Sequence, residues 1–434
     1  MQANGAIQQQ LSSSFFESMA THVSKPPALK AIKGRGALSN TTGRFSPTRS
    51  IALEDGWYTD DNQPDSIATE VRVELAKTII TKNNSPDVPF NQSINPYRGC
   101  EHGCVYCYAR PSHTFWDYSA GLDFETKLIY KATAAELLEQ TITKPNYKME
   151  PVAIGSNTDP YQPIEKQKGI TREILKVLQR HRHPFSIITK GSLIERDIDI
   201  LQDMAKDNLC TVTISVTTLD NDLKRIMEPR AATPSARLKT IEKLSKAGIP
   251  VGVLVAPIIP AINDSEMESI LAVCAKAGAT NASYVFLRLP REVKDLFREW
   301  LVQHYPQRTA HVMNMMQQSR GGRFYDSTYG QRMKGKGPFA QVIEKRFEVA
   351  CRKLGLSTER RVPTQTKLEH DLTFEATKKT TDQKQDRKHL DIQNRGSLNS
   401  DKVNSGKVNQ ANLIASDRIS HITRLVKENQ LALF

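Results

Sequence analysis

Residues 95–111 of this 434-residue chain read NPYRGCEHGCVYCYARP and contain three of its six cysteines. Cys100, Cys104 and Cys107 are separated by three and then by two residues, so a single loop can wrap their thiols around one side of a compact metal centre. Cysteine thiolates are the usual ligands of iron–sulfur clusters. Glycines directly precede the first two cysteines, and they let the backbone turn tightly and bring N–H groups towards the sulfurs.

Three thiolates for a cluster of four irons leave one iron without a protein ligand. An open iron can chelate the amino and carboxylate groups of S-adenosylmethionine and place the sulfonium of that molecule against the cluster for one-electron reduction. The loop therefore predicts a [4Fe-4S] cluster and S-adenosylmethionine as cofactors, with Cys100, Cys104 and Cys107 as both metal ligands and catalytic residues.

Structural zinc is the alternative reading of this loop. Zinc normally takes four Cys or His ligands, and His102 or His113 could complete a Cys3His site. The three other cysteines, Cys210, Cys274 and Cys351, each lie in an apolar pattern and are interpreted as small core residues.

Composition limits the class of protein. An apolar fraction of 38% is low for a globular chain, which indicates polar extensions at the ends. No stretch approaches the roughly 18 to 20 apolar residues of a membrane helix, and the start lacks a signal-peptide pattern, so we expect a soluble, cytoplasmic protein that does not bind membranes. The net charge of +13 makes nucleic acid a possible partner, or reflects a solvated basic surface.

The middle of the chain alternates short β-branched runs with helical patterns. Strands are expected over residues 152–155, 185–189, 211–216, 251–256 and 283–288. Helices are expected over residues 172–182, 196–206, 235–247, 265–277 and 292–303. Thr233 and Pro234 should begin the third of these helices as N-cap and first helical residue. An earlier strand over 127–130, followed by a capping box of Thr133 and Glu136, repeats the pattern.

Repeated strand–helix units give a parallel sheet, as either a barrel or an open doubly wound sheet. Polar residues follow the expected strands at 156–159, 189–192, 217–220 and 260–264. Because active sites of parallel α/β folds lie at the carboxyl ends of the strands, these loops should converge on one pocket, unless they serve only as turns and caps.

The cysteine loop resembles the signature of the radical S-adenosylmethionine superfamily. Together with residues 155–165, GSNTDPYQPIE, it is similar to the branch that contains spore photoproduct lyase and the so-called DNA repair photolyases, and most similar to an uncharacterised bacterial family in that branch. The likeness extends over about residues 34–356. It implies an α/β fold, namely a partial (β/α)6 TIM-like barrel, with the cluster loop after the first strand.

The resemblance also implies cofactor contacts. Tyr106 would pack on the adenine, and the loop with Ser156 and Asn157 would lie where the superfamily binds the methionine amino group, although the usual Gly-Gly-Glu motif is absent here. Lys190 and Ser215 match cofactor contacts at the ends of the next two strands. Arg230 could bind the cofactor carboxylate bidentately. A reducing electron donor of flavodoxin or ferredoxin type is implied as partner.

We expect four regions: a disordered or extended arm over 1–65, a radical S-adenosylmethionine core over 66–310, a cover of the barrel over 311–363, and a polar tail over 364–434 with a possible short terminal helix. Residues 320–332, RGGRFYDSTYGQR, followed by a helix over 339–354, would form a lid or would bind nucleic acid.

Three hypotheses follow. The first is a radical enzyme that cleaves S-adenosylmethionine to a 5′-deoxyadenosyl radical and acts on an unknown substrate. The second is a metal-stabilised nucleic-acid-binding protein, and the third is a radical enzyme that repairs or modifies nucleic acid. Repair of thymine lesions by the lyase's own route is not implied, because the lyase uses a cysteine as hydrogen donor and this chain has none between residues 108 and 209.

Overall fold

The computed structural model describes residues 31–46, 66–359 and 361–363. The polar tail expected over 364–434, its terminal helix and most of the N-terminal arm lie outside these residues. The strands are β1 (Glu70–Glu74), β2 (Ile80–Lys82), β3 (Gln92–Ile94), β4 (Tyr97–Arg98), β5 (Lys127–Lys131), β6 (Val152–Ile154), β7 (Phe185–Thr189), β8 (Cys210–Ser215), β9 (Val251–Ile258) and β10 (Asn281–Phe286). The helices are α2 (Asp123–Thr126), α3 (Ala134–Ile142), α4 (Glu165–Lys168), α5 (Ile170–Arg180), α6 (Ile198–Lys206), α7 (Asn221–Met227), α8 (Pro234–Lys246), α9 (Met267–Lys276), α10 (Val293–His304), α11 (Thr309–Gln318) and α12 (Gly337–Leu354).

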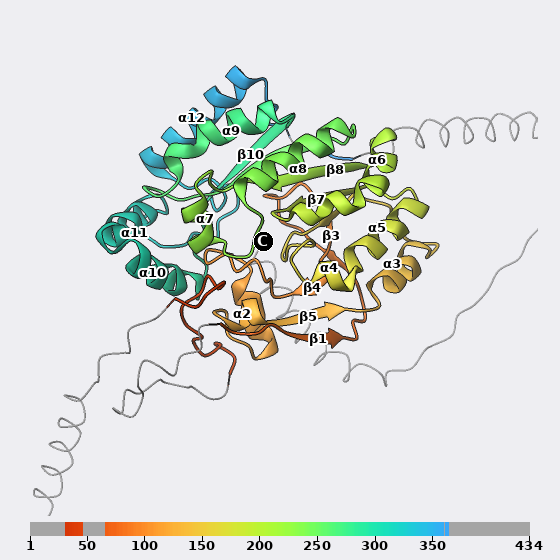
Figure 1. Ribbon diagram of the computed structural model, residues 1–434, viewed down its shortest axis with the longest axis horizontal. Coiled ribbons are helices and arrows are strands. Elements are labelled where there is room, and N and C mark those ends of the chain that lie inside the picture. The colour runs from red at the N-terminus through yellow and green to blue at the C-terminus, as the bar shows by residue number, and fades with distance from the viewer. Residues whose placement is uncertain (1–30, 47–65, 360, 364–434) are drawn as a thin grey trace, which may run out of the picture.

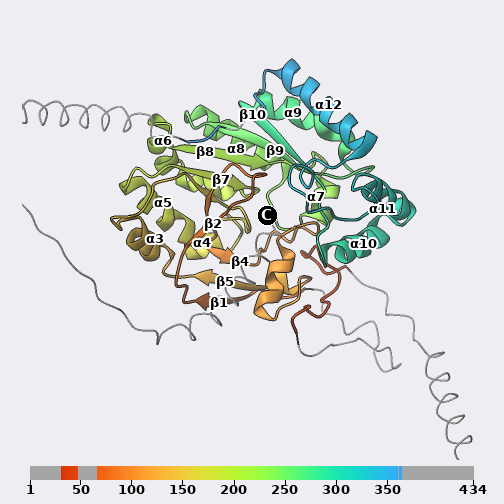
Figure 2. The same ribbon diagram turned by 180° about the vertical axis from the view of Figure 1, so that it is seen from behind.

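The main sheet has the strand order β10-β9-β8-β7-β6-β3-β2. Its first six strands in this order run parallel, and β2 is antiparallel to β3. The parallel strands follow one another in chain order without a reversal, whereas a doubly wound sheet reverses at a switch point. The fold is therefore the expected partial (β/α)6 barrel, with helices on the outside of the curved sheet (Figures 1 and 2).

Alternation along β8 directs one set of side chains to the outer core and the other set to an internal cavity. In β8, Cys210, Val212 and Ile214 belong to the large core under the helices, while Thr211, Thr213 and Ser215 line an internal cavity. Because successive side chains of a strand point to opposite faces, the same strand serves both layers. Cys274 and Cys351 also lie in this core, which confirms the interpretation of the three isolated cysteines.

Local predictions held where the patterns were strong. The expected strand over 185–189 matches β7 in full, and Thr233 caps α8 by accepting a hydrogen bond from the Ala236 amide at 3.3 Å. The capping box at Thr133 was wrong, because its side chain makes no capping bond to α3. The strand over 127–130 exists as β5, but it pairs with β1 and β4 in a separate three-stranded sheet instead of extending the barrel pattern (Figure 1).

The described part of the expected N-terminal arm, residues 31–46, is packed against the body of the protein. Ala37 and Leu38 are buried, and the amides of Gly36 and Ala37 each donate to the Glu125 carboxylate at 2.9 Å. The arm expected to be disordered or extended has no helix or strand in these residues, but it packs on the body because the buried Glu125 carboxylate requires the donors that they supply.

A second core forms where α7, α10 and α11 meet the cysteine loop. It includes Val105 and Tyr106 beside Phe297 and Trp300, and the Trp300 indole N–H donates to the Ile226 carbonyl at 3.0 Å. The loop is thus packed as a core segment on one side. Within the described ranges, no helix combines enough length and apolarity to cross a bilayer.

The ion pair between Arg110 and Glu125 gives a stability prediction, because both side chains are fully buried. Replacing Glu125 with Ala leaves a buried guanidinium without its counter-charge and should lower the free energy of unfolding by about 3–5 kcal/mol. Arg225→Ala breaks the exposed Arg225–Asp222 pair and is the matched control, which should leave stability nearly unchanged. Chemical denaturation measures both, and equal effects would contradict this account.

Candidate active site

A cavity of about 350 Å³ opens inside the barrel, and all three cysteines of the motif line it. Its walls come from the cysteine loop, the loops after β6 and β7, and the inner faces of β8, β9 and β10. This size suits a small-molecule ligand. The predicted residues that line it are Cys100, Cys104, Tyr106, Cys107, Ser156, Asn157, Lys190 and Ser215.

The cysteine loop turns as its glycines require. Gly99 and Gly103 have φ values of 73° and 67°, in the left-handed region that glycine adopts at low cost. The Cys100 amide donates to the Phe124 carbonyl at 2.8 Å, and the Val105 amide donates to the Met227 carbonyl at 3.1 Å. The loop is therefore fixed at both ends, by the segment of α2 and by the end of α7.

Arg110 holds the inside of the loop. Its guanidinium donates to the carbonyls of Gly103 at 3.3 Å and Cys104 at 2.9 Å, and it pairs with Glu125. Glu125 in turn binds the amides of residues 36 and 37. One buried ion pair thus ties the cysteine loop, α2 and the N-terminal segment together.

Cys100 and Cys104 are buried, and Cys107 is half-buried. Burial raises the pKa of Cys104 to about 12 and also raises that of Cys107, while the pKa of Cys100 is raised further by burial and by Asp159. Such thiols become thiolates when a bound metal supplies the compensating positive charge.

The zinc alternative requires four ligands around one ion. Among the described residues, no three His, Cys, Asp or Glu side chains are close enough to share one metal ion. A four-iron cluster binds its thiolates on different irons, farther apart than the ligands of a single ion. The two histidines of the zinc alternative have other contacts: His102 Nδ1 lies 3.3 Å from Asp159 Oδ2, and His113 Nε2 lies 3.0 Å from the Lys127 carbonyl.

Asp159 joins the loops after β6 and β7 beneath the cysteines. It accepts hydrogen bonds from the Thr189 hydroxyl at 2.6 Å and the Lys190 amide at 2.7 Å, and it contacts His102. Burial alone would raise the pKa of Asp159, but His102 and these donors hold it at about 2. The carboxylate therefore stays charged and fixes the position of Lys190.

Asn95 shapes the loop that carries Ser156 and Asn157. Its side-chain oxygen accepts from the amides of Asn157 at 2.9 Å and Thr158 at 3.3 Å, and its amide nitrogen donates to the Ser156 hydroxyl at 3.2 Å. Gly155 begins this loop with a φ of 90°, and a Cβ there would lie 2.4 Å from the Ile188 carbonyl. The Asn95 contacts and the close packing at Gly155 thus fix the backbone of this loop.

Lys190, Ser215 and Tyr106 meet at one wall of the cavity. The Lys190 ammonium donates to the Ser215 hydroxyl at 2.8 Å and lies 5.9 Å from the centre of the Tyr106 ring. The Tyr106 hydroxyl donates to Glu228, which pairs with the buried Arg237. Burial alone would raise the pKa of Glu228, but the positive charges of Arg237 and Lys190 outweigh it and lower this pKa to about 2.

Arg230 lies apart from this group. Its guanidinium pairs with Glu101 at 3.2 Å, its side chain is 38% exposed, and it does not line the cavity. Of the four polar loops expected to converge, those after β6 and β7 reach the cavity. The loops at 217–220 and 260–264 bind each other instead: Thr218 donates to Glu266 at 2.7 Å, and Asn263 donates to the Thr217 carbonyl at 2.8 Å.

Sequence reasoning missed several residues that position the site. Gln162 bridges the cysteine loop, with its oxygen accepting from the Glu101 amide at 2.8 Å and its amide donating to the Gly99 carbonyl at 3.2 Å. Gln162 and Asp159 lie within the quoted run 155–165, so the family pattern contained a signal for both. Arg237 lies on α8, and nothing in its local sequence distinguishes it from a surface residue.

The segment after α11 borders the open side of the barrel. Phe286 on the edge strand β10 donates its amide to the Met333 carbonyl at 2.8 Å, and Arg332 pairs with Asp87 in the loop after β2. This segment therefore spans from one edge strand of the sheet towards the other. Arg320 and Arg332, which the nucleic-acid hypothesis placed on a binding surface, are buried.

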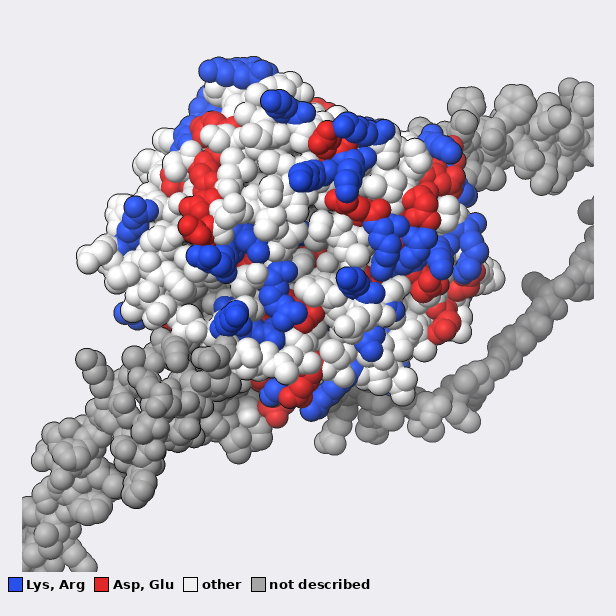
Figure 3. Space-filling view, viewed as in Figure 1, with Lys and Arg blue, Asp and Glu red and all other residues white. Residues whose placement is uncertain are grey.

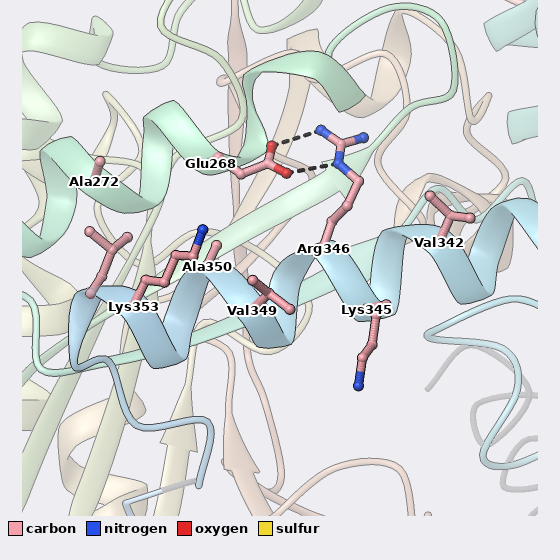
Figure 4. A pocket seen from close by; sticks show the side chains of 9 residues that line it. Glu268, Ala272, Val342, Lys345, Arg346, Val349, Ala350 and Lys353 are labelled. Atoms are coloured by element: carbon pink, nitrogen blue, oxygen red, sulfur yellow. Dashed lines mark hydrogen bonds and ion pairs between the residues drawn. The ribbon is translucent and has the colours of Figure 1, made fainter.

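A second pocket lies on the outer surface between α9 and α12 (Figure 4). It is lined by the aliphatic parts of α12 and by the Arg346–Glu268 pair, at 2.7 Å. It contains none of the residues expected to bind a cofactor, and we do not assign it to the chemistry.

Gly103→Ala tests the packing of the cysteine loop. An added Cβ would lie 2.8 Å from Glu125 Oε2 and 3.1 Å from Pro229 Cγ, in addition to the strain of a positive φ. Gly34→Ala is the matched control, since its φ is 75° and nothing lies within 4 Å. We expect the control to cost about 1–2 kcal/mol of stability and Gly103→Ala to cost more and also to reduce iron binding after reconstitution. Equal iron content in the two variants would refute close packing here.

Known proteins resemble this chain over a region that includes the cysteine loop. The family model described as the radical SAM superfamily, where SAM denotes S-adenosylmethionine, matches residues 94–274. An uncharacterised protein of Mycobacterium tuberculosis is 36% identical over 236 residues, which cover 54% of this chain and 69% of the relative. An uncharacterised protein of Methanocaldococcus jannaschii is 28% identical over 214 residues, covering 49% of this chain and 76% of the relative.

Among solved structures, a mutant of spore photoproduct lyase is similar with a TM-score of 0.49 and 15% identity. The match covers 66% of this chain and 81% of that chain.

Proposed function

Since the chain belongs to the radical S-adenosylmethionine superfamily, we propose that it is an enzyme in which Cys100, Cys104 and Cys107 hold a [4Fe-4S] cluster. When bound, the cluster would supply the electron that cleaves S-adenosylmethionine reductively to a 5′-deoxyadenosyl radical. The observation that supports this most is the placement of two buried cysteines and the half-buried Cys107, on a loop fixed by Arg110, against an internal cavity.

The remaining cofactor contacts are proposed from the same cavity. Ser156 and Asn157 would bind the amino end of S-adenosylmethionine, Tyr106 would contact the adenine, and Lys190 with Ser215 would bind polar groups between them. All five line the cavity. Arg230, expected from the sequence to bind the cofactor carboxylate, is better explained as a residue that holds the cysteine loop through Glu101.

We place the reaction in the cytoplasm, where thiols stay reduced, and propose a flavodoxin or ferredoxin type protein as the electron donor. The rival hypothesis of a nucleic-acid-binding protein loses support from Arg320 and Arg332, which are buried. On the face shown in Figure 3, basic and acidic side chains are also intermixed.

Anaerobic reconstitution tests the proposal. The wild-type chain should bind about four irons and four sulfides, and with dithionite and S-adenosylmethionine it should produce 5′-deoxyadenosine, measured by mass spectrometry. Replacing Cys100, Cys104 or Cys107 with Ala should reduce this product by roughly 100-fold or more, because each removes a cluster ligand. Cys351→Ala, which alters a core cysteine, is the control and should retain activity.

A fully reduced four-iron cluster that leaves S-adenosylmethionine intact would contradict the proposed function. One zinc per chain with salt-dependent nucleic-acid binding would instead favour the rival.

A further inference from the structure

The cavity that holds the cysteine loop extends to the opposite end of the barrel, where Glu359 and Arg361 line it. These two residues follow α12 and lie at the amino ends of the strands. Arg361 donates to the side-chain oxygen of Asn208, just before β8, at 2.8 Å. The nearby Ser357 carbonyl accepts from the Ala282 amide, near the start of β10, at 2.8 Å. The cavity therefore has a second end, which we call its amino end.

Four uncharged polar side chains face the cavity from the strands themselves. Their neighbours along the chain, such as Ile187, Val212 and Ala282, belong to the large outer core. Because successive side chains of a strand point to opposite faces, the four project inward. We call them the inner polar row: Ser186 of β7, Thr211 and Thr213 of β8, and Asn281 of β10.

Strand register places the inner polar row nearer the amino end than the proposed cofactor contacts. Thr213 and Asn281 are level with each other, since both pair with Gly252 of β9. The proposed cofactor contact Ser215 lies two residues beyond Thr213 and four beyond Thr211 on the same strand. At about 3.3 Å per residue in a parallel strand, these separations are roughly 7 Å and 13 Å. A small molecule held by the row could therefore reach towards the cofactor with its other end.

Gly252 makes room for the Asn281 carboxamide inside the barrel. A Cβ at position 252 would lie 2.7 Å from Asn281 Nδ2 and 2.8 Å from Asn281 Oδ1. Both separations are too short for a real contact, so a side chain at this position would displace the carboxamide. The carboxamide can therefore lie across β9, where it presents a donor and an acceptor side by side.

The side chains of the inner polar row have no hydrogen-bond partner among the residues that the structure describes. The unpartnered side-chain atoms that are sealed from solvent belong to other residues, so the polar atoms of the row face the space of the cavity. Ser215 differs, because its hydroxyl accepts from the Lys190 ammonium at 2.8 Å. A ligand that displaces water from the row must replace the hydrogen bonds that water makes, which only a polar group can do.

The composition of this part of the cavity favours an uncharged ligand group. Burial of an ionised group is costly without a counter-charge, and the row contains none. Hydroxyl and carboxamide groups can instead donate and accept hydrogen bonds. The adjoining Ile188 and Leu254 are apolar. Apart from cysteines and tyrosines, the ionisable side chains that line the cavity all lie outside the strands: Asp87, His102, Asp159, Lys190, Arg288, Glu359 and Arg361.

We propose that the inner polar row binds the substrate through an uncharged group that both donates and accepts hydrogen bonds, an amide or a hydroxyl carried on an apolar body. The apolar body would lie along Ile188 and Leu254, and its far end would reach the cofactor. That the bound molecule is a substrate rests on the proposed function. The binding site itself follows from the inward faces of β7, β8 and β10.

Saturation-transfer NMR titration of the reconstituted full-length protein, with the cluster oxidised and S-adenosylmethionine present, tests the site. The probes share a benzene ring and differ in one substituent: benzamide, benzyl alcohol, benzoate and benzylamine. At least one uncharged probe should bind saturably, and about tenfold or more tightly than benzoate and benzylamine, because the charged probes lose hydration without gaining a counter-charge.

Variants of the row locate the binding. Thr213→Val removes a hydroxyl at constant shape, and Asn281→Ala removes the carboxamide; each should weaken binding of the preferred probe roughly five- to tenfold. Gly252→Ala keeps every polar group but displaces the Asn281 carboxamide, and it should weaken binding similarly. Thr143→Val makes the same chemical change as Thr213→Val at the exposed end of α3, and it should bind like wild type.

Preference for benzamide would support an amide, preference for benzyl alcohol would support a hydroxyl, and equal binding would support the chemistry that they share. Tighter binding of a charged probe, no saturable binding of either uncharged probe, or binding that the three barrel variants leave unchanged would overturn the proposal. If circular dichroism shows that Thr213→Val does not fold, the Asn281 and Gly252 variants decide.

A second readout separates this proposal from the proposed function. Variants that weaken binding of S-adenosylmethionine, but not of the uncharged probe, would assign the row to the cofactor and overturn the inference. Probe binding that depends on the row, in a protein that forms no 5′-deoxyadenosine, would support the site and refute only the radical chemistry. Formation of 5′-deoxyadenosine without any probe binding would refute only the site.

Discussion

The buried ion pair between Arg110 and Glu125 is the contact on which the geometry of the site depends. The Arg110 guanidinium donates hydrogen bonds to two backbone carbonyls of the cysteine loop. The Glu125 carboxylate accepts hydrogen bonds from two amides of the N-terminal segment. Because neither charge reaches water, each must be satisfied by the other and by these backbone groups. The loop can therefore keep three thiols in fixed positions without a strand or helix to carry them.

The two faces of the barrel strands carry side chains with different roles. Outward side chains such as Val212 and Ile214 build the core, while inward side chains such as Thr213 and Ser215 add polar groups to a largely apolar cavity wall. The loops after β6 and β7 are joined through Asp159, and the segment after α11 brings its arginines to the edge strand β10. The cavity is thus bordered by loops from several strands of one sheet.

Local patterns in the sequence were sufficient for the cysteine loop and for the strands with clear alternation, such as β7. They were insufficient for β3, whose three residues are too few to show a period. The role of residues 36 and 37 was also hidden, because their partner Glu125 lies almost ninety positions away. The local sequence did not show that Arg230 pairs with Glu101 or that Arg237 pairs with Glu228. Long-range pairing of buried charges was the missing information.

Electron paramagnetic resonance of the reduced cluster, with S-adenosylmethionine labelled with nitrogen-15 at its amino group, tests the central claim most directly. If three cysteines leave one iron open, addition of the labelled molecule should change the spectrum and introduce hyperfine coupling to that nitrogen. A fully reduced four-iron cluster whose spectrum stays the same, with no nitrogen coupling, would contradict the account.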